Sequence, residues 1–123
     1  MCQRTPARVP EPAIVTELNE PQNISCHSPG HSVSSCLWGH SLNGTAQAII
    51  IDEKTVANGG AMSVSGFSFA GDGEDLDRGD CTLQITNVTA DHFGLWSCTL
   101  ITRNSTVFGG AVRLGKPEIH RLF

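Results

Sequence analysis

The sequence predicts an all-β fold in which two sheets pack face to face, and three observations point to it. Cys81, Leu83 and Ile85 alternate with the polar Thr82 and Gln84, which gives one strand an apolar face and a hydrated face. The 13 glycines and 6 prolines break the apolar residues into short runs, as in chains of many short strands and turns. The length of 123 residues suffices for one hydrophobic core and not for two.

The first half of the chain is expected to hold a lead segment and four strands. Residues 1–12, which contain three prolines, are expected to be extended and poorly ordered, and the domain itself is expected over 13–114. The Asn43-Gly44 pair predicts a tight hairpin turn before the fourth strand. The strands are predicted from alternating or β-branched residues at 13–18, 23–27, 33–38 and 47–51.

The second half is expected to hold a loop, four strands and a terminal stub. Residues 54–62 have loop composition, and 71–80 form a turn rich in glycine and aspartate. Residues 115–123 are expected to be a linker stub. The strands are predicted at 63–70, with Val64 or Phe67 and Phe69 inward, then at 81–85, through Trp96 and Cys98 to 103, and at 106–114, with Asn104-Ser105 at the tip of the last hairpin.

Cysteines and glycosylation motifs indicate the compartment. Five cysteines without a Cys-x-x-Cys pair favour disulfides. Four acceptor motifs for N-glycosylation favour the secretory pathway; they begin at Asn23, Asn43, Asn87 and Asn104. No apolar run approaches the ~20 residues that cross a bilayer. We therefore expect an extracellular fragment of a cell-surface protein, whose targeting and anchoring parts lie outside this chain and provide its only contact with a membrane.

One stretch of the chain resembles a known family. The pattern Asp91-x-x-Gly94-x-Trp96-x-Cys98, preceded by Leu83-x-Ile85-x-x-Val88, resembles the immunoglobulin superfamily, of the variable or intermediate type. The resemblance implies a two-sheet Greek-key sandwich. It also implies a structural core that contains Trp38, Trp96, Asp91 and Gly94. Trp96 departs from the pattern, because the family usually has a tyrosine there, and its indole N–H could serve in place of the hydroxyl.

The resemblance also bears on the cysteines. Four cysteines can pair in three ways, and strand phase together with the family pattern selects Cys26–Cys98 and a second bond between the sheets, Cys36–Cys81. Cys2 is left over, either as a free terminal thiol or as a link to another chain. The extra pair, with Gly-x-Trp-x-Cys at the corner, resembles invertebrate cell-surface adhesion domains of the fasciclin III type. The segment 108–110 resembles the glycine bulge in the last strand of variable-type domains.

Several motifs have a functional and a plain interpretation. Arg78-Gly79-Asp80 spells the tripeptide that some integrins bind, and it falls in the turn beside Cys81; a simple Gly-Asp turn is the plainer interpretation. Five acidic residues lie between positions 72 and 80, but their spacing differs from that of a helix-loop-helix calcium site, so a hydrated acidic turn is favoured.

Metal, nucleic-acid and catalytic functions are not favoured by the sequence. Cys26 and His27 point to opposite faces of a strand, which disfavours zinc with His31 and Cys36. The net charge of −4, with only eight Lys and Arg, disfavours nucleic acid as a partner. No Gly-x-Ser-x-Gly, phosphate-loop or His-Glu-x-x-His motif is present. We expect neither an enzyme nor a cofactor.

A protein-binding face is the favoured functional site. Leu37, Thr99 and Ile101 are expected to point outward from one sheet, beside one of the two alternating sets of residues in the strand 47–51. The plainer interpretation is that scattered apolar residues are normal on protein surfaces. The resemblance implies an adhesion or recognition module whose partner is a second copy, as a homodimer, or another ectodomain. The alternative is a secreted immune-type or soluble binding domain that uses the end loops 27–33 and 103–106.

Overall fold

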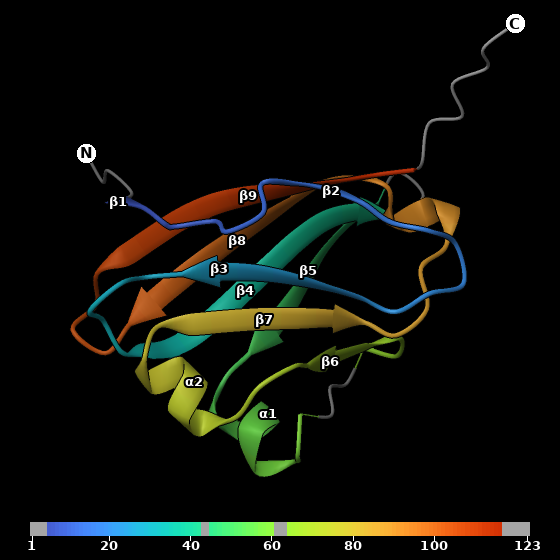
Figure 1. The fold of residues 1–123 in the computed structure, drawn as a ribbon. Coiled ribbons are helices and arrows are strands. Elements are labelled where there is room, and N and C mark those ends of the chain that lie inside the picture. The colour runs from blue at the N-terminus through green and yellow to red at the C-terminus, as the bar shows by residue number, and fades with distance from the viewer. Residues whose placement is uncertain (1–4, 43–44, 61–63, 117–123) are drawn as a thin grey trace, which may run out of the picture.

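The computed structural model describes residues 5–42, 45–60 and 64–116 (Figure 1). These residues form mostly β-strands, arranged in two sheets, with two helices of five residues each and one 3₁₀ turn. The prediction of a mostly β chain with two sheets is therefore confirmed. The expected Asn43-Gly44 turn and the leftover Cys2 lie outside the described residues.

The larger sheet has six strands. Its order is β1 (Thr5–Pro6), β9 (Val107–Gly115), β8 (Gly94–Thr102), β4 (Val33–Leu42) and β5 (Thr45–Ile51), and β2 (Ala13–Val15) also pairs with β9. The β4, β5, β8 and β9 neighbours are antiparallel, whereas β1 and β2 run parallel to β9. One edge of this sheet is thus formed by β5, and two short strands line the other.

The smaller sheet has three antiparallel strands. β7 (Asp80–Ile85) lies between β3 (Gln22–His27) and β6 (Phe67–Phe69). On β7, Cys81, Leu83 and Ile85 are fully buried and the residues between them are partly exposed, which is the alternation that the sequence predicts. The buried side faces the larger sheet, and Figure 1 shows β3 and β7 lying across β4 and β8.

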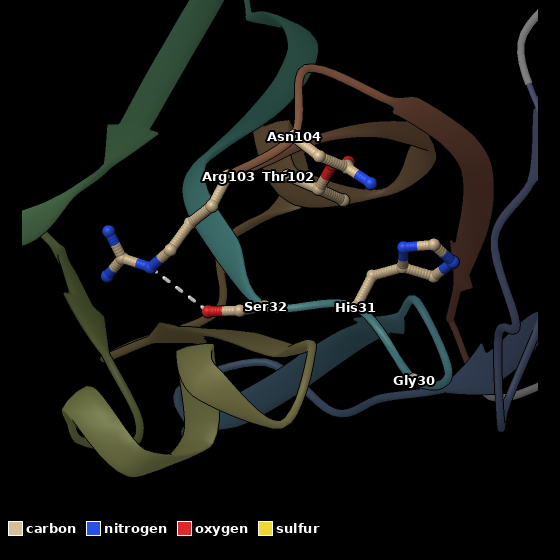
Figure 2. Close-up of a pocket in the computed structure, with 6 residues that line it drawn as sticks. All are labelled: Gly30, His31, Ser32, Thr102, Arg103 and Asn104. Carbon is tan, nitrogen blue, oxygen red and sulfur yellow. Dashed lines mark hydrogen bonds between the residues drawn. The ribbon is translucent and has the colours of Figure 1, made fainter.

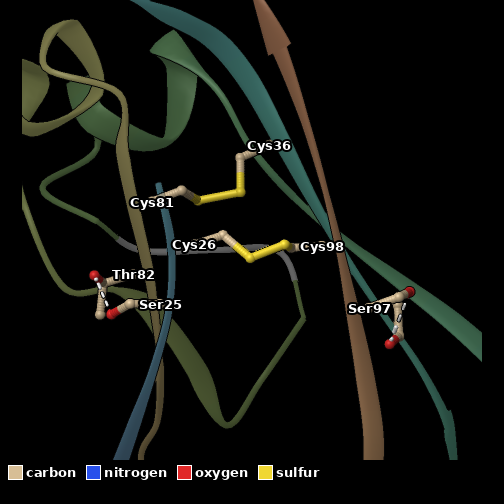
Figure 3. The surroundings of a disulfide bond; sticks show 8 residues. Ser25, Cys26, Cys36, Cys81, Thr82, Ser97 and Cys98 are labelled. Atoms are coloured by element: carbon tan, nitrogen blue, oxygen red, sulfur yellow. Dashed lines mark hydrogen bonds between the residues drawn. A yellow bond between two sulfur atoms is a disulfide. The ribbon is translucent and has the colours of Figure 1, made fainter. Parts of the chain in front are cut away.

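The two disulfides cross the core between the sheets. The bonds are Cys26–Cys98 and Cys36–Cys81, as predicted. Cys26 and Cys81 are directly opposite each other in the β3–β7 ladder, so the two bridges stand side by side (Figure 3). Trp38 is opposite Cys98 in the β4–β8 ladder and is fully buried. Its indole N–H has no acceptor among the described residues, so Trp38 contributes apolar volume rather than a hydrogen bond.

Two expected loops contain short helices. α1 (Glu53–Ala57) and α2 (Gly73–Asp77) lie where the sequence predicts a loop and an acidic turn. Each begins with a capping box, Asp52 with Thr55 and Asp72 with Asp75, in which the first side chain accepts from a backbone N–H one turn later. Leu76 then anchors α2 in the core. Both capping boxes can be recognised in the sequence. However, aspartate and glycine also favour turns, so these two segments were expected to be a loop and a turn.

Two smaller expectations also need correction. Thr5–Pro6 pairs with Phe108 and Gly109, so the lead segment joins the sheet from residue 5 instead of being poorly ordered. Ala7 and Val9 pack against the core and hold it there. The β8–β9 ladder runs without a register shift through 108–110, so no glycine bulge is present. Gly110 is needed for space, since a Cβ there would lie 2.9 Å from Val9 Cγ2 and 3.2 Å from Cys98 Sγ.

Candidate functional site

The expected binding residues come together on the larger sheet. Leu37 is opposite Thr99 in the β4–β8 ladder, and Ile101 is opposite Ser35. All three of the expected residues are partly exposed, because their neighbours along each strand point into the core. On the other side of β4, Leu37 is opposite Ile50, whose side chain is 53% exposed. We call the following set the outer face: Ser35, Leu37, Ala48, Ile50, Thr99 and Ile101.

Ile50 is the member of the outer face that the sequence could not place. Ile49, Ile50 and Ile51 are consecutive, so an apolar alternation cannot show which of them points outward. The β4–β5 register settles the phase, with Ile49 and Ile51 buried and Ile50 exposed.

The outer face is free of charge. The outward positions of β4, β5 and β8 carry only aliphatic residues, glycine, serine and threonine. Most protein surface is studded with charged side chains, and the cores of protein interfaces are depleted of them. An uncharged, partly aliphatic sheet face of this kind can be dehydrated at low electrostatic cost.

A second candidate site is a cleft at one end of the sandwich. Figure 2 shows the loop between β3 and β4 facing the turn between β8 and β9 across it. The cleft has a volume of about 210 Å³, and its lining is largely polar. It is lined by Gly30, His31, Ser32, Thr102, Arg103 and Asn104. His31 also lies against Phe108, with ring centroids 5.0 Å apart, so its ring orientation is partly fixed.

Arg103 ties this end of the molecule together. Its guanidinium is 3.0 Å from the Glu53 carboxylate and 3.7 Å from that of Asp77, and its Nε donates to Ser32 Oγ at 3.1 Å. The side chain thereby links the β8–β9 turn to α1, to α2 and to the loop before β4. A guanidinium already matched by two carboxylates is a poor anchor for an additional anion, so the cleft favours neutral polar groups.

The Arg-Gly-Asp motif is tied to the fold by local contacts, and only its glycine is buried. Arg78 ends α2 and pairs with Asp75, with 2.5 Å between Nη2 and Oδ1. Gly79 is buried with φ +89°, and a Cβ there would lie 2.2 Å from the Ser28 carbonyl oxygen. Asp80 opens β7 and lies 2.5 Å from His27 Nδ1. The acid and the base of the motif therefore both have partners within the chain, and the tripeptide does not project as a free loop tip.

The acidic residues between 72 and 80 serve the local structure. Asp72 and Asp75 cap α2, and the remaining carboxylates include partners of Arg78, Arg103 and His27. Within the residues that the structure describes, no group of three or more histidine, cysteine, aspartate or glutamate side chains is arranged to hold a metal ion. Cys26 and Cys36, considered above as zinc ligands, are both in disulfides.

At the other end, Trp96 organises the corner before β8. Its Nε1 donates to the His92 carbonyl at 2.9 Å, so the indole makes a hydrogen bond to corner backbone. The His40 ring stacks on the indole, with centroids 4.3 Å apart and planes at 4°. His40 Nδ1 and Nε2 each lie 2.9 Å from a backbone carbonyl, those of Leu95 and Asp91. These two carbonyls and the stacked indole fix the orientation of the His40 ring.

The resemblance placed Asp91 and Gly94 in the core, and this is wrong for Asp91. Asp91 belongs to the 3₁₀ turn Ala90–His92, and its side chain is exposed, since a carboxylate without a buried cation stays hydrated. Gly94 is partly buried, and its φ of +119° explains why glycine is used there. Trp38 and Trp96 are fully buried.

His92 is the corner residue with a shifted pKa. Burial lowers its pKa below the ordinary value of 6.5, nearby His40 lowers it further, and Asp91 acts in the opposite direction. Its Nδ1 accepts a hydrogen bond from the Thr89 N–H at 2.8 Å, which requires an unprotonated nitrogen and fits the neutral ring.

The glycosylation acceptors in the described residues are all exposed. Asn23 lies on β3, Asn87 lies in the turn after β7, and Asn104 lies at the tip between β8 and β9 beside the cleft. Asn43 lies outside the described residues. None of the three belongs to the outer face, and a glycan on Asn104 would stand next to the cleft, at the end of β8.

No protein-family model matches the chain, and no curated protein matches it significantly. In the described residues, no helix is both long and apolar enough to cross a bilayer.

Proposed function

We propose that this chain is an extracellular recognition module of the immunoglobulin type, which binds another protein ectodomain, or a second copy of itself, through the outer face. The proposal contains no catalytic step and no cofactor. The observation that carries it is the uncharged surface formed by Leu37, Ile50, Thr99 and Ile101 across three neighbouring strands.

The arrangement of strands supports an immunoglobulin-type Greek key. β3, β7 and β6 oppose β9, β8, β4 and β5, and the chain changes sheet after β2, β3, β5 and β7. The bond Cys26–Cys98 joins the two sheets beside the buried Trp38. A tryptophan packed beside an inter-sheet disulfide is a hallmark of immunoglobulin domains.

The chemistry of the chain supports an extracellular location. Two disulfides are buried in the core, and such bonds persist in oxidising compartments. The exposed acceptor asparagines at 23, 87 and 104 are compatible with glycosylation in the secretory pathway.

The rigidity of the outer face supports binding through it. Each of its residues lies on a strand of an antiparallel ladder, with Cys36 and Cys98 fixing β4 and β8 to the opposite sheet. A preformed surface loses little conformational entropy when a partner binds. Aliphatic side chains at its centre would be dehydrated in the complex and would contribute most of the affinity.

The test replaces Leu37 and Ile101 by aspartate in the glycosylated protein. Two buried carboxylates should abolish binding, because a charge in a dehydrated interface is costly. Sedimentation velocity measures self-association, and adhesion of coated beads to one another and to cells measures recognition. Leu18→Asp is the matched control, since Leu18 is also exposed, at 52%, but lies in a turn away from the sheets. Equal self-association and adhesion in the parent protein, the aspartate pair and the Leu18→Asp control would refute the outer face as the site.

The second candidate function is ligand binding by the end loops, and the cleft between them is the observation that favours it. Its test is His31→Ala, which alters one wall of the cleft and leaves both the outer face and the Asn104 acceptor motif intact. If this variant abolishes adhesion while the aspartate pair does not, the chain is a binding domain that uses its loops.

A further inference from the structure

The larger sheet is protected along one edge and open along the other. On one side, β1 and β2 both pair with β9. On the other side, β5 pairs with β4, and no strand among the described residues pairs with the far side of β5. α1 follows after the end of β5 and does not lie along it (Figure 1).

The open edge lacks the usual devices that prevent pairing with another chain. Proteins guard edge strands with lysine, proline, bulges or very short strands. β5 has seven residues, Thr-Ala-Gln-Ala-Ile-Ile-Ile, without a charge, a proline or a glycine. Its register with β4 is unbroken from Thr45 to Ile51, so no bulge twists the edge away.

We propose that β5 pairs with β5 of a second copy of this chain, antiparallel, to join two larger sheets into one. The strand is suited to itself because it has no charge to repel its copy. A two-fold axis at Ala48, the middle residue, aligns all seven positions. It places the small Ala46 opposite the exposed Ile50 of the second copy on the outer side, and two Ala48 residues face each other.

The joined sheet has an acceptable size. The larger sheet is five strands wide, because β1 and β2 follow one another along the same side of β9. Two copies would give a sheet about ten strands wide, which is within the range of open sheets. The inference goes beyond the proposed function, since it uses the backbone edge of β5 and not the outward side chains of three strands.

Two proline variants test the edge, one at Gln47, outside the outer face, and one at Ala48, within it. Successive residues in an antiparallel ladder direct their N–H groups to opposite sides. Of Gln47→Pro and Ala48→Pro, one therefore removes an N–H that points to the free edge, and the other breaks a bond to β4. Both side chains are exposed, so neither change leaves a cavity. Thermal unfolding identifies the variant that keeps the β4 ladder, because it is the more stable of the two.

Sedimentation equilibrium of the full chain with Cys2→Ser then measures the dimer. The stable proline variant should raise the dimer dissociation constant roughly thirtyfold, because the two-fold axis removes two hydrogen bonds at once. An unchanged dissociation constant, or a parent protein that is monomeric at the highest soluble concentration, would overturn the proposal. The aspartate pair at Leu37 and Ile101 decides the outer face separately, so either proposal can fail while the other stands.

A charge-swap experiment tests the register. Ala48→Lys and Ala48→Glu should each dissociate the dimer, since the axis places like charges directly opposite each other. An equimolar mixture of the two should dimerise at least as well as the parent. Ala48→Ser is the neutral control at the same exposed position. Failure of the mixture to associate would exclude pairing centred on residue 48, and association of each charged variant alone would do the same.

Discussion

Removal of the Cys36–Cys81 disulfide should lower the free energy of unfolding by about 3 kcal/mol. In the loop-entropy account, a disulfide stabilises by restricting the unfolded chain, and a loop of 45 residues on its own predicts roughly 4 kcal/mol. However, Cys26–Cys98 already restricts the same chain. Only the segments 26–36 and 81–98, of 10 and 17 residues, separate the two bridges. The loop that Cys36–Cys81 closes is effectively shorter, which reduces the expected loss.

The same reasoning applies in the opposite order. With Cys36–Cys81 intact, Cys26–Cys98 closes a path of about 27 residues, so its removal should cost roughly 3.5 kcal/mol. Each bond alone is thus a large share of the stability of an ordinary domain. Removal of both should cost roughly 7 to 8 kcal/mol, which is comparable with the whole net stability of most domains. We therefore expect the chain with four alanines to be unfolded.

The assay is urea unfolding of the parent and of the two double-alanine variants, with the remaining disulfide verified by mass spectrometry. The slope of unfolding free energy against urea should increase in both variants, because a chain with one cross-link exposes more surface when it unfolds. A melting point about 10 °C lower should accompany the loss of either bond.

Two results would contradict this reasoning. If removal of Cys36–Cys81 lowered the free energy of unfolding by less than about 1 kcal/mol and left the urea slope unchanged, this bond would not restrict the unfolded chain. Both sulfurs of each bond are buried, so the small cavities left by alanine affect the two variants similarly. A loss for Cys36–Cys81 that clearly exceeds the loss for Cys26–Cys98 would contradict the nested-loop argument.

Three further predictions concern single residues. Trp96→Phe should cost about 2 kcal/mol in urea unfolding, because it removes the bond to the His92 carbonyl and part of a buried ring; an unchanged midpoint would contradict this. Gly79→Ala should cost at least about 2 kcal/mol, while Gly30→Ala, with a similar φ but no atom within 4 Å, should cost about 1 kcal/mol; equal losses would show that the close contact at Gly79 is unimportant. Because the pKa of His92 is lowered in the folded protein, its contribution to stability is present above pH 6.5 and is lost as the pH falls through the lowered pKa, so His92→Gln should lose less stability on acidification than the parent; matching pH profiles would argue against it.

The strands were predictable because their signals are local and periodic, and the disulfides because strand phase was combined with the family pattern. Cys81, Leu83 and Ile85 are buried at every second position, and the cysteine phase on four strands limits the pairings. The two helices were not predicted. Each has only five residues, and the residues that form its capping box also favour turns. Asp91 shows another limit, since a family pattern fixes the position of a residue in the sequence but not the burial of its side chain.

The candidate site was only partly predictable for a related reason. Leu37, Thr99 and Ile101 could be assigned to an outward face from the phase of their own strands. Ile50 could not, because three consecutive isoleucines have no phase of their own, and only pairing with β4 assigns it. The cleft at the end loops depends on how two distant turns approach each other, which no local pattern encodes.

The two candidate surfaces differ in what holds them in place, and this difference favours the outer face. The walls of the cleft are joined by the Arg103 N–H, which donates to the Ser32 carbonyl at 3.0 Å, and by ion pairs of the Arg103 side chain, which is 52% exposed and whose carboxylate partners on α1 and α2 are more exposed still. Exposed ion pairs contribute about 1 kcal/mol at most and weaken as salt screens them. The outer face is held instead by backbone ladders that two buried disulfides fix to the opposite sheet. Partner binding at the outer face should therefore persist at high salt, whereas binding that depends on the cleft should weaken as its walls loosen.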